Sequence, residues 1–390
     1  MDPYETQILR RRAHTPESRF TGVKIQGDAV PRLPEAVNRV RRAVAEHLDD
    51  AGLTLVGCSG GADSLALAAA AAFHQGRAGA DGGTFRVGAV VVDHQLHPDS
   101  AEVTTTAAAQ LRGLGLDPVL TLTAEVAPDS PEGPEAAART GRYRAFRQAL
   151  AETGAAQILL AHTRDDQSEQ VLLGLARGSG TRSLAGIPAV RGPFRRPLLE
   201  ITRAETEEVC AHAGLSPWQD PANMDPRHLR SRVRHRVLPY LEQELSGSIR
   251  DALARTARIA ADDAAHLESL ARDAFARLLE GPDDAGSDTG LVRGTQGLTG
   301  GSLRLDLDRL AAEPPAIRRR VIALAVVAAG GAAPSQERIM ALERLCSRRG
   351  SAGPVQLEGR VTAWRGTQDS VDYGKLVIVP PERTAPSPDA

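Results

Sequence analysis

The chain has 390 residues, of which 42% are hydrophobic and 25% charged, a composition typical of a soluble globular protein with two or three domains. Its net charge of −2 excludes a chain that is basic throughout, and only Lys24 and Lys375 among 47 basic residues are lysines, so arginine must bind most anions. Cys58, Cys210 and Cys346 form no CxxC pair, and the sequence has neither a membrane-spanning run nor a signal peptide, so we expect a cytoplasmic protein with reduced thiols and no membrane partner.

Apolar runs and helical patterns alternate in the first half of the chain. After a helix at 33–48, we expect strands at 53–57, 85–94, 117–123 and 157–162, and helices at 64–74, 101–115, 134–154 and 165–178. This alternation predicts the α/β class, with a doubly wound parallel sheet. The ligand of such a sheet lies at the carboxyl ends of its strands.

The pattern changes after residue 180. We expect helices at 201–215, 249–280, 314–331 and 335–349, a basic helical segment at 225–245, a loop at 281–301, and strands at 353–366 and 374–379. A capping box, Thr202 with Glu205, marks the start of the first of these helices. The chain then divides into a flexible extension (1–33), an α/β domain (34–226), a basic helical linker (227–285), a small α+β accessory domain (286–378) and a disordered tail (379–390).

The segment CSGGADS, residues 58–64, lies between the first strand and the next helix. Gly60 and Gly61 allow a tight turn, and the helix N-terminus directs backbone N–H groups towards an anion. Ser59 and Ser64 add hydroxyl donors, whereas Asp63 would repel phosphate and is better suited to Mg²⁺. Neither a Walker A motif nor GxGxxG is present. The segment therefore predicts a phosphate-binding loop that differs from both of these motifs.

SGGxDS after the first strand is the signature of N-type ATP pyrophosphatases, also called PP-loop or adenine nucleotide alpha hydrolase-like enzymes, and this chain resembles them. VDHQLH (92–97), ARTGRYRAF (138–146), AHTRDDQSEQ (161–170), RRPLLEITRAE (195–205) and DPANMDPRHLRSRVRHRVLP (220–239) further resemble segments of tRNA(Ile)-lysidine synthetases. The resemblance covers about residues 50–240. Thr163, Gln170 and His97 depart from the family pattern, which has His, Thr and Arg there.

The resemblance implies a reaction and its partners. ATP, with Mg²⁺, would adenylate the wobble cytidine of a tRNA(Ile) that carries a CAU anticodon, and free lysine would displace AMP to form lysidine. It implies catalytic roles for Asp63, Asp166 and Arg142, with Mg²⁺ on Asp63 and Asp166. ATP would be bound by the residues Ser59, Gly60, Gly61, Ala62, Asp63, Ser64, Asp93 and His94. The oligomeric state stays open, and a homodimer is compatible with the sequence.

Three polar residues follow the strand at 157–162. Asp165 and Asp166 open a helix, so N-capping and interaction with the helix dipole are one interpretation. The other, which we favour, is that His162, Asp165 and Asp166 bind lysine or metal at the ligand edge of the sheet. Arg139 and Arg142, three residues apart on another helix, form either a solvated face or contacts to tRNA and ATP phosphate.

The most basic part of the chain follows residue 226. Its arginines are Arg227, Arg230, Arg232, Arg234 and Arg236, with no acidic residue between them. A charge run is often a solvated face, but this density favours a tRNA-backbone contact, which Arg318–Arg320 would extend.

Two other functions are consistent with parts of this pattern. A thiolase-type PP-loop enzyme that modifies tRNA would need paired cysteines, which the three isolated cysteines do not provide. A nucleotide- and RNA-binding protein without catalysis would not need both an intact SGGADS and the DDQ sequence at 165–167. Release of AMP that depends on both tRNA and lysine would distinguish lysidine synthesis from these two alternatives.

Overall fold

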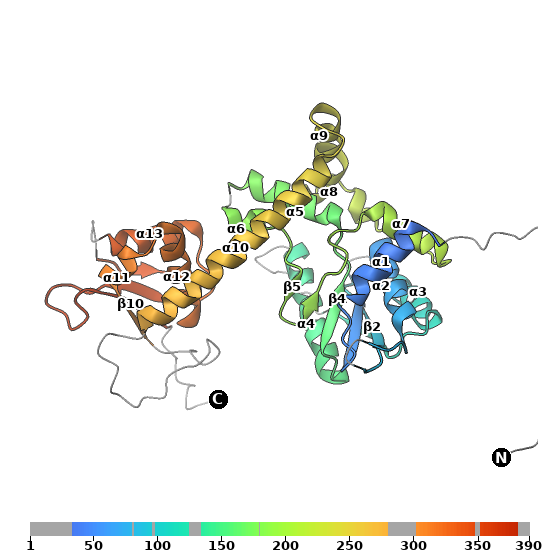
Figure 1. The fold of residues 1–390 in the computed structure, drawn as a ribbon, viewed down its shortest axis with the longest axis horizontal. Helices are drawn as coiled ribbons and strands as arrows, with labels where there is room; N and C mark the ends of the chain where they lie inside the picture. The colour runs from blue at the N-terminus through green and yellow to red at the C-terminus, as the bar shows by residue number, and fades with distance from the viewer. Residues whose placement is uncertain are drawn as a thin grey trace, which may run out of the picture.

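This computed structural model describes residues 33–79, 82–95, 98–124, 134–178, 180–279, 302–347 and 352–380. The chain contains a six-stranded sheet and a four-stranded sheet, which lie in separate parts of the chain and are connected by one long helix (Figure 1). The extension before residue 33, His97, the loop at 281–301 and the tail after residue 380 lie outside the described residues. No helix in the described ranges is both long and apolar enough to cross a membrane.

The first sheet has the strand order β3-β2-β1-β4-β6-β5. Its strands are β1 (Leu53–Cys58), β2 (Arg86–Asp93), β3 (Val119–Thr123), β4 (Gln157–Leu160), β5 (Val190–Arg191) and β6 (Phe194–Arg195). Only β5 runs antiparallel to its neighbour; the other pairs are parallel. The predicted doubly wound α/β fold is therefore confirmed. The short hairpin of β5 and β6 escapes prediction because each strand has only two residues.

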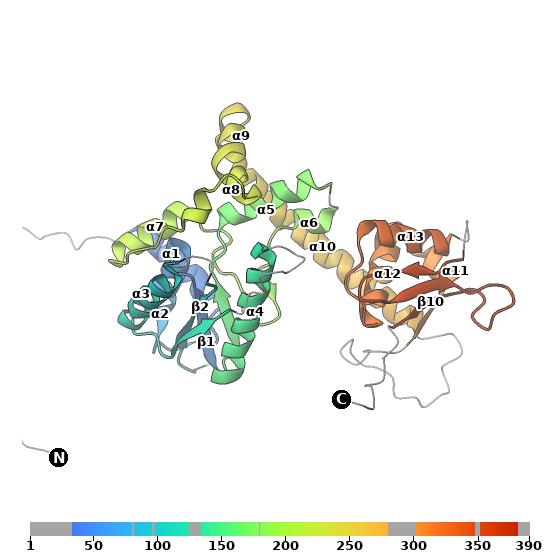
Figure 2. The same ribbon diagram turned by 180° about the vertical axis from the view of Figure 1, so that it is seen from behind.

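Helices cover both faces of this sheet (Figures 1 and 2). They are α1 (Glu35–Ala45), α2 (Ala62–His74), α3 (Ser100–Gly113), α4 (Pro134–Thr153) and α7 (Arg203–His212). The helix α5 (Arg164–Ala176) follows β4 and packs mainly on helices of the next segment. One apolar core joins α1, α2, α3 and α7 to the sheet, and a second joins α4 to the opposite face. Leu65 and Leu67 belong to the first core and Phe146 to the second, and most of the residues in both cores are alanine, leucine or valine.

The segment between the sheets is helical. It contains α6 (Thr181–Leu184), the 3₁₀ helix η1 (Pro221–Met224), α8 (Leu229–Arg232), the π-helical turn η2 (Val233–Val237), α9 (Leu238–Glu244) and α10 (Ile249–Leu279). The basic segment expected as one helix is thus helical from residue 229 to 244, with a π turn inside it. The helix α10 has 31 residues and is therefore about 46 Å long, and it packs against both α5 and α12.

The C-terminal sheet is antiparallel, in the order β7-β10-β9-β8. The strands of this sheet are β7 (Leu303–Asp306), β8 (Val355–Gln356), β9 (Thr362–Arg365) and β10 (Lys375–Val379), and the helices of the same region are α11 (Leu307–Ala312), α12 (Pro315–Ala328) and α13 (Gln336–Cys346). The strand β7 and the helix α11 were not predicted from the sequence. Two signals were available: Leu303 and Leu305 alternate with exposed Arg304, and Asp306 caps α11 through the N–H groups of Asp308 and Arg309.

Candidate active site

The CSGGADS loop follows β1 and is held together by Ser64. The Ser64 hydroxyl accepts the Ser59 N–H at 3.2 Å and donates to the Gly61 carbonyl at 2.9 Å. Gly60 has φ +83°, a left-handed conformation that favours glycine. Since α2 begins at Ala62, the N–H groups of its first turn have no acceptor inside the helix. The loop thus presents free donors at a helix N-terminus, while the Ser64 proton is already used within it.

Arg203 brings Asp63 and Asp166 together. Its Nη2 lies 3.4 Å from Asp63 Oδ2 and 3.5 Å from Asp166 Oδ1, although the two carboxylates belong to α2 and α5. The Thr206 hydroxyl donates to Asp63 Oδ1 at 2.5 Å. Arg203 and Thr206 both come from the start of α7, where the predicted capping box of Thr202 and Glu205 is confirmed. The N-terminus of α7 therefore organises the two carboxylates.

The two carboxylates differ in pKa. Burial raises the pKa of Asp63, and Arg203 and the Thr206 hydroxyl offset only part of this effect. Burial also disfavours the charge on Asp166, but Arg203 and Arg230 outweigh it, so the pKa of Asp166 lies below its usual value. Asp166 is therefore ionised at neutral pH, and Arg203 and Arg234 are its cationic partners. A pair of carboxyl groups whose pKa values are pushed apart is common in active sites.

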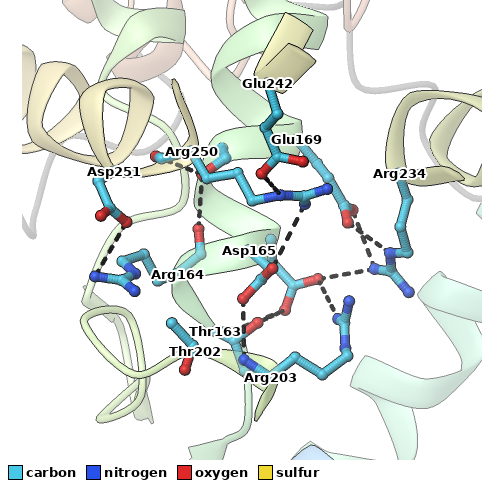
Figure 3. Close-up of polar contacts among 12 residues, drawn as sticks. Thr163, Arg164, Asp165, Glu169, Thr202, Arg203, Arg234, Glu242, Arg250 and Asp251 are labelled. Atoms are coloured by element: carbon cyan, nitrogen blue, oxygen red, sulfur yellow. Dashed lines mark hydrogen bonds and ion pairs between the residues drawn. The ribbon is translucent and has the colours of Figure 1, made fainter. Parts of the chain in front are cut away.

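The adjacent residues Asp165 and Asp166 have different partners. Asp165 Oδ2 accepts the Arg203 N–H at 2.9 Å, and its Oδ1 lies 3.5 Å from Arg250 Nη1 (Figure 3). Asp166 Oδ2 accepts the N–H and the hydroxyl of Thr163, at 2.8 and 3.1 Å. Both aspartates thus stabilise helix starts, as the capping interpretation expects. Thr163, which departs from the family pattern, is fully buried and helps to orient Asp166; nothing in the structure explains Gln170.

Glu169 adds a third carboxylate to this cluster. Its side chain is 0% exposed; Arg234 Nε lies 2.5 Å from its Oε1, and Arg230 Nε 2.9 Å from its Oε2. Arg234 Nη2 also donates to Asp166 Oδ1 at 3.2 Å, so it connects the two acids of α5. Figure 3 shows Arg234 reaching Glu169 from the neighbouring helical segment. Two arginines predicted to contact tRNA therefore face inward, against α5.

A group of cationic side chains surrounds His94 and His162 at the carboxyl ends of β2 and β4. The Nδ1 atoms of both are buried and lack a hydrogen-bond partner among the described residues. Burial and the neighbouring Arg142 lower the pKa of His94, and burial lowers the pKa of His162 to about 4. Both imidazoles are neutral at pH 7. Buried Arg196 donates to the Tyr143 hydroxyl at 3.3 Å, and its Nε has no acceptor within the described chain. These unpaired polar atoms favour a ligand site.

The other predicted binding residues have local contacts. Asp93 Oδ1 accepts the Gln95 N–H at 2.9 Å, where β2 ends. The exposed Arg139 places its guanidinium 5.2 Å from the centre of the Tyr143 ring. Burial and the nearby Arg139 lower the pKa of Arg142, which remains far above neutral pH. A ligand phosphate near Arg142 would therefore meet a permanently charged guanidinium.

Three arginines of the basic segment lie outside this cluster. Arg227 pairs with Asp225 at 2.6 Å on the surface. Arg232 Nη1 donates to the carbonyls of Pro226 and Arg227 at 2.9 and 3.0 Å. Arg236 is exposed. Of the five arginines in this segment that were predicted to contact tRNA, Arg227 and Arg236 are the exposed ones.

Several site residues were missed from the sequence. Glu169 had a signal, because it follows Asp166 by three residues on one helix and so shares its face. Arg203 had a weaker one, since it stands directly after the capping residue Thr202. Arg196 belongs to the family-like segment at 195–205, but that resemblance assigned it no role. Thr206 carried no signal, because its role depends on how α7 packs against the sheet.

Asp63 and Asp166 carry oxygens, the ligand type that Mg²⁺ prefers, and one oxygen of each lies close to the same point. That point is occupied by Arg203 Nη2, so a bound Mg²⁺ ion would have to displace the guanidinium. No cluster of three or more His, Cys, Asp or Glu within the described ranges forms a complete metal cage. Mg²⁺ in nucleotide enzymes is usually held by one or two carboxylates together with substrate phosphates, which this pair satisfies.

Comparison with known proteins identifies the family. Residues 34–241 match the family described as the PP-loop domain, and residues 305–368 match the TilS substrate binding domain. A U34-tRNA thiolase from Methanococcus maripaludis superposes with a TM-score of 0.48 and 17% identity, covering 58% of this chain and 79% of that one.

Relatives of this chain share most of its length. The tRNA(Ile)-lysidine synthase of Leifsonia xyli subsp. xyli is 47% identical over 84% of this chain and 92% of its own. That of Streptomyces coelicolor is 43% identical over 86% and 87%, and that of Mycobacterium bovis 40% identical over 90% and 92%. The resemblance in the sequence motifs is thereby confirmed, and this chain belongs to the tRNA(Ile)-lysidine synthase family.

Proposed function

We propose that this protein uses ATP to ligate free lysine to the wobble cytidine of tRNA(Ile) with a CAU anticodon. In the first step the carbonyl oxygen at C2 of the cytosine attacks the α-phosphate, and pyrophosphate leaves. In the second step the ε-amine of lysine bonds to C2, and AMP leaves with the former carbonyl oxygen. One proton of the amine is released. Unstacking the cytosine is feasible in an anticodon loop.

The convergence of Asp63 and Asp166 on Arg203 is the observation that carries this proposal. It joins the nucleotide loop to the start of α5, within 3.4 and 3.5 Å of one nitrogen. A nucleotide on the loop and a group bound at α5 would therefore lie side by side. An adenylation followed by an amine attack requires this proximity.

We assign the departing pyrophosphate to the loop of residues 59–64 and the N-terminus of α2, which offer N–H donors to negative charge. Arg142 and Arg203 are placed to stabilise charge that develops on the phosphates. Bound Mg²⁺, held by Asp63 and Asp166, would neutralise part of the phosphate charge. The negative charge of Asp63 would repel the phosphates, so a cation must lie between the Asp63 carboxylate and the phosphates.

We assign the lysine side chain to the acids of α5. Asp166 is ionised at neutral pH, and the neighbouring Glu169 is fully buried between arginines. An ammonium group beside Asp166 would find a negative partner. Because the pKa of Asp166 is lowered, the proton released in the second step would pass to solvent rather than to this carboxylate. His162, neutral at pH 7, provides a further acceptor.

A thiolase reaction is not favoured by the cysteines. The chain has three, and all are free and buried. Burial raises the pKa of Cys58 and raises those of Cys210 and Cys346 to about 12. Thiols that remain protonated are poor sulfur carriers.

The test is a lysine-incorporation assay. Purified protein is mixed with ATP, Mg²⁺, labelled lysine and unmodified CAU-anticodon tRNA(Ile), and labelled tRNA, AMP and pyrophosphate are measured. Lysine transfer with stoichiometric AMP is expected. Absence of both lysine transfer and ATP turnover would contradict the proposal.

The Asp63→Asn variant sharpens this assay, because it keeps the side-chain size but removes the charge. We expect at least a hundredfold loss of AMP release with an unchanged circular dichroism spectrum, as when one electrostatic contact to a transition state is removed. Asp372→Asn is the matched control: it breaks the 2.7 Å pair with Arg304 in the C-terminal sheet and should retain activity. Full activity of Asp63→Asn would contradict the role of Asp63.

We also retain two expectations about the whole molecule. A homodimer is tested by light scattering of the purified protein. A cytoplasmic location follows from its substrates, tRNA, ATP and free lysine, and fractionation of cells that express a tagged chain tests it.

A further inference from the structure

A small cavity lies between α6, α10 and α12, with a volume of about 210 Å³. Figures 1 and 2 show α6 and α12 beside α10, and both helices pack on it. The lining consists of three arginines, one glutamate and two alanines: Arg182, Arg272, Arg320, Glu268, Ala264 and Ala265. The cavity shares no residue with the candidate active site.

The charges in this cavity are unbalanced. Glu268 is the single acid in its lining and pairs with Arg272 at 3.7 Å, one helical turn away. Arg182 forms no ion pair with a described residue. Arg320 donates from Nη1 to the Ala316 carbonyl at 2.9 Å, but its Nε is buried and has no acceptor in the described part of the chain. Three guanidiniums against one carboxylate leave an excess positive charge and an unused donor.

This chemistry fits a phosphate group. Guanidinium groups bind phosphate oxygens bidentately, and the lining offers no aromatic ring on which a base could stack. A buried donor without an acceptor costs free energy until a ligand or water supplies one. The volume suits a phosphate with water better than a whole nucleotide.

The position of the cavity favours a polymeric phosphate over a free one. Arg182 belongs to the region that matches the PP-loop domain, and Arg320 to the region that matches the TilS substrate binding domain. A polyanion that contacts both regions must pass along α10, which carries Arg272. We propose that this cavity binds one backbone phosphate of tRNA and thereby ties the two regions to the same substrate. This inference rests on the proposed function, because it takes tRNA as the substrate.

The experiment measures tRNA affinity against salt concentration, from 50 to 300 mM, for single variants of the full chain. Arg182→Ala and Arg272→Ala should each weaken binding about fivefold and reduce the salt slope by about 1, as loss of one phosphate contact does. Glu268→Gln should tighten binding, because it removes the negative charge. Arg255→Ala is the control, since Arg255 is exposed on the same helix but does not line the cavity.

Equal affinities and salt slopes for Arg182→Ala, Arg272→Ala and Arg255→Ala would overturn the inference. A second outcome would also overturn it. In that outcome inorganic phosphate raises the melting temperature of the wild type but not of Arg272→Ala, while both proteins bind tRNA equally well, so the cavity binds free phosphate only. Lysine transfer at saturating tRNA should stay near the wild-type rate in the variants. If the wild type neither binds tRNA nor transfers lysine, the proposed function fails instead.

Discussion

Two arginine-rich segments, residues 227–236 and 318–320, form the same kind of ion-pair group but differ in how deeply its acid is buried. In each group, two arginines bind one glutamate. Arg230 and Arg234 bind Glu169, whose side chain is 0% exposed. Arg318 and Arg319 bind Glu343, both at 2.8 Å, and that side chain is 12% exposed.

The difference lies in what replaces a lost partner. Water is able to reach the Glu343 carboxylate, which is 12% exposed. The Glu169 carboxylate is 0% exposed although its partner Arg230 is 35% exposed, so the two groups differ in the burial of the acid. In both segments a minority of the arginines stays accessible to RNA: Arg236 and the surface-paired Arg227 in the first, and Arg320, which lines the cavity, in the second. A basic run in a sequence therefore overstates the charge that it offers to a partner.

The largest effect is expected for Glu169→Gln. The change removes the buried counter-charge that Arg230 and Arg234 share, and breaking a buried ion pair typically costs about 3–5 kcal/mol. We expect a drop of this size in the free energy of unfolding in urea, together with loss of lysine transfer. A drop below about 1 kcal/mol would mean that water enters the cluster, and the contrast with Glu343 would disappear.

Glu343→Gln should cost less, about 1 kcal/mol, because solvent screens the same kind of pair. Urea unfolding measures this as well, and lysine transfer at saturating tRNA should persist. Glu337→Gln, on the exposed side of the same helix, is the control and should be neutral. A cost as large as that of Glu169→Gln would contradict the importance of burial.

The pH dependence offers a finer comparison. Burial opposes the charge on Glu343, but Arg319 and Arg318 outweigh it, so its pKa lies below the ordinary value of 4.5. A lowered pKa of an acid means extra stability above about pH 4.5, which is lost as pH falls through the pKa of the folded state. The difference in unfolding free energy between wild type and Glu343→Gln should therefore shrink from pH 6 to pH 4. A constant difference would show that the pair does not depend on the charge.

The smallest effect on stability is expected for Arg236→Ala. Arg236 is exposed, so the free energy of unfolding should change by less than about 0.5 kcal/mol. Its effect should appear only in tRNA binding, as a few-fold weaker affinity with a smaller salt slope. Unchanged affinity at 50 mM salt would remove Arg236 from the tRNA surface.

The fold followed from the sequence where patterns were long. Buried strands such as β2, with a continuous apolar run from Val87 to Val92, and helices with clear starts, such as α7 after Thr202, are set by local chemistry. Elements of two to six residues, such as β5, β7 and α11, have too few positions for periodicity and depend on tertiary pairing.

The site was predictable to the level of the sheet edge. The carboxyl ends of parallel strands lie at one edge, so Asp63 and Asp166 were expected there, but the pairing of β1 with β4 was not predicted. The direction of each side chain was not predictable. Asp165 and Asp166 are neighbours with different partners, and Arg203 reaches Asp63 across 140 residues of chain. The spacing of Arg230 and Arg234 predicts a shared face, but only the packing decides that this face points inward.

The scarcity of lysine has a chemical consequence. An adenylated cytidine is an electrophile that any nearby primary amine is able to attack, including one on the protein. Within the described ranges the one such side chain is Lys375, which pairs with Asp306 at 3.0 Å on the C-terminal sheet, away from the nucleotide loop. The arginines around the loop remain protonated and are poor nucleophiles. In the proposed reaction this composition protects the enzyme from cross-linking itself to its own intermediate.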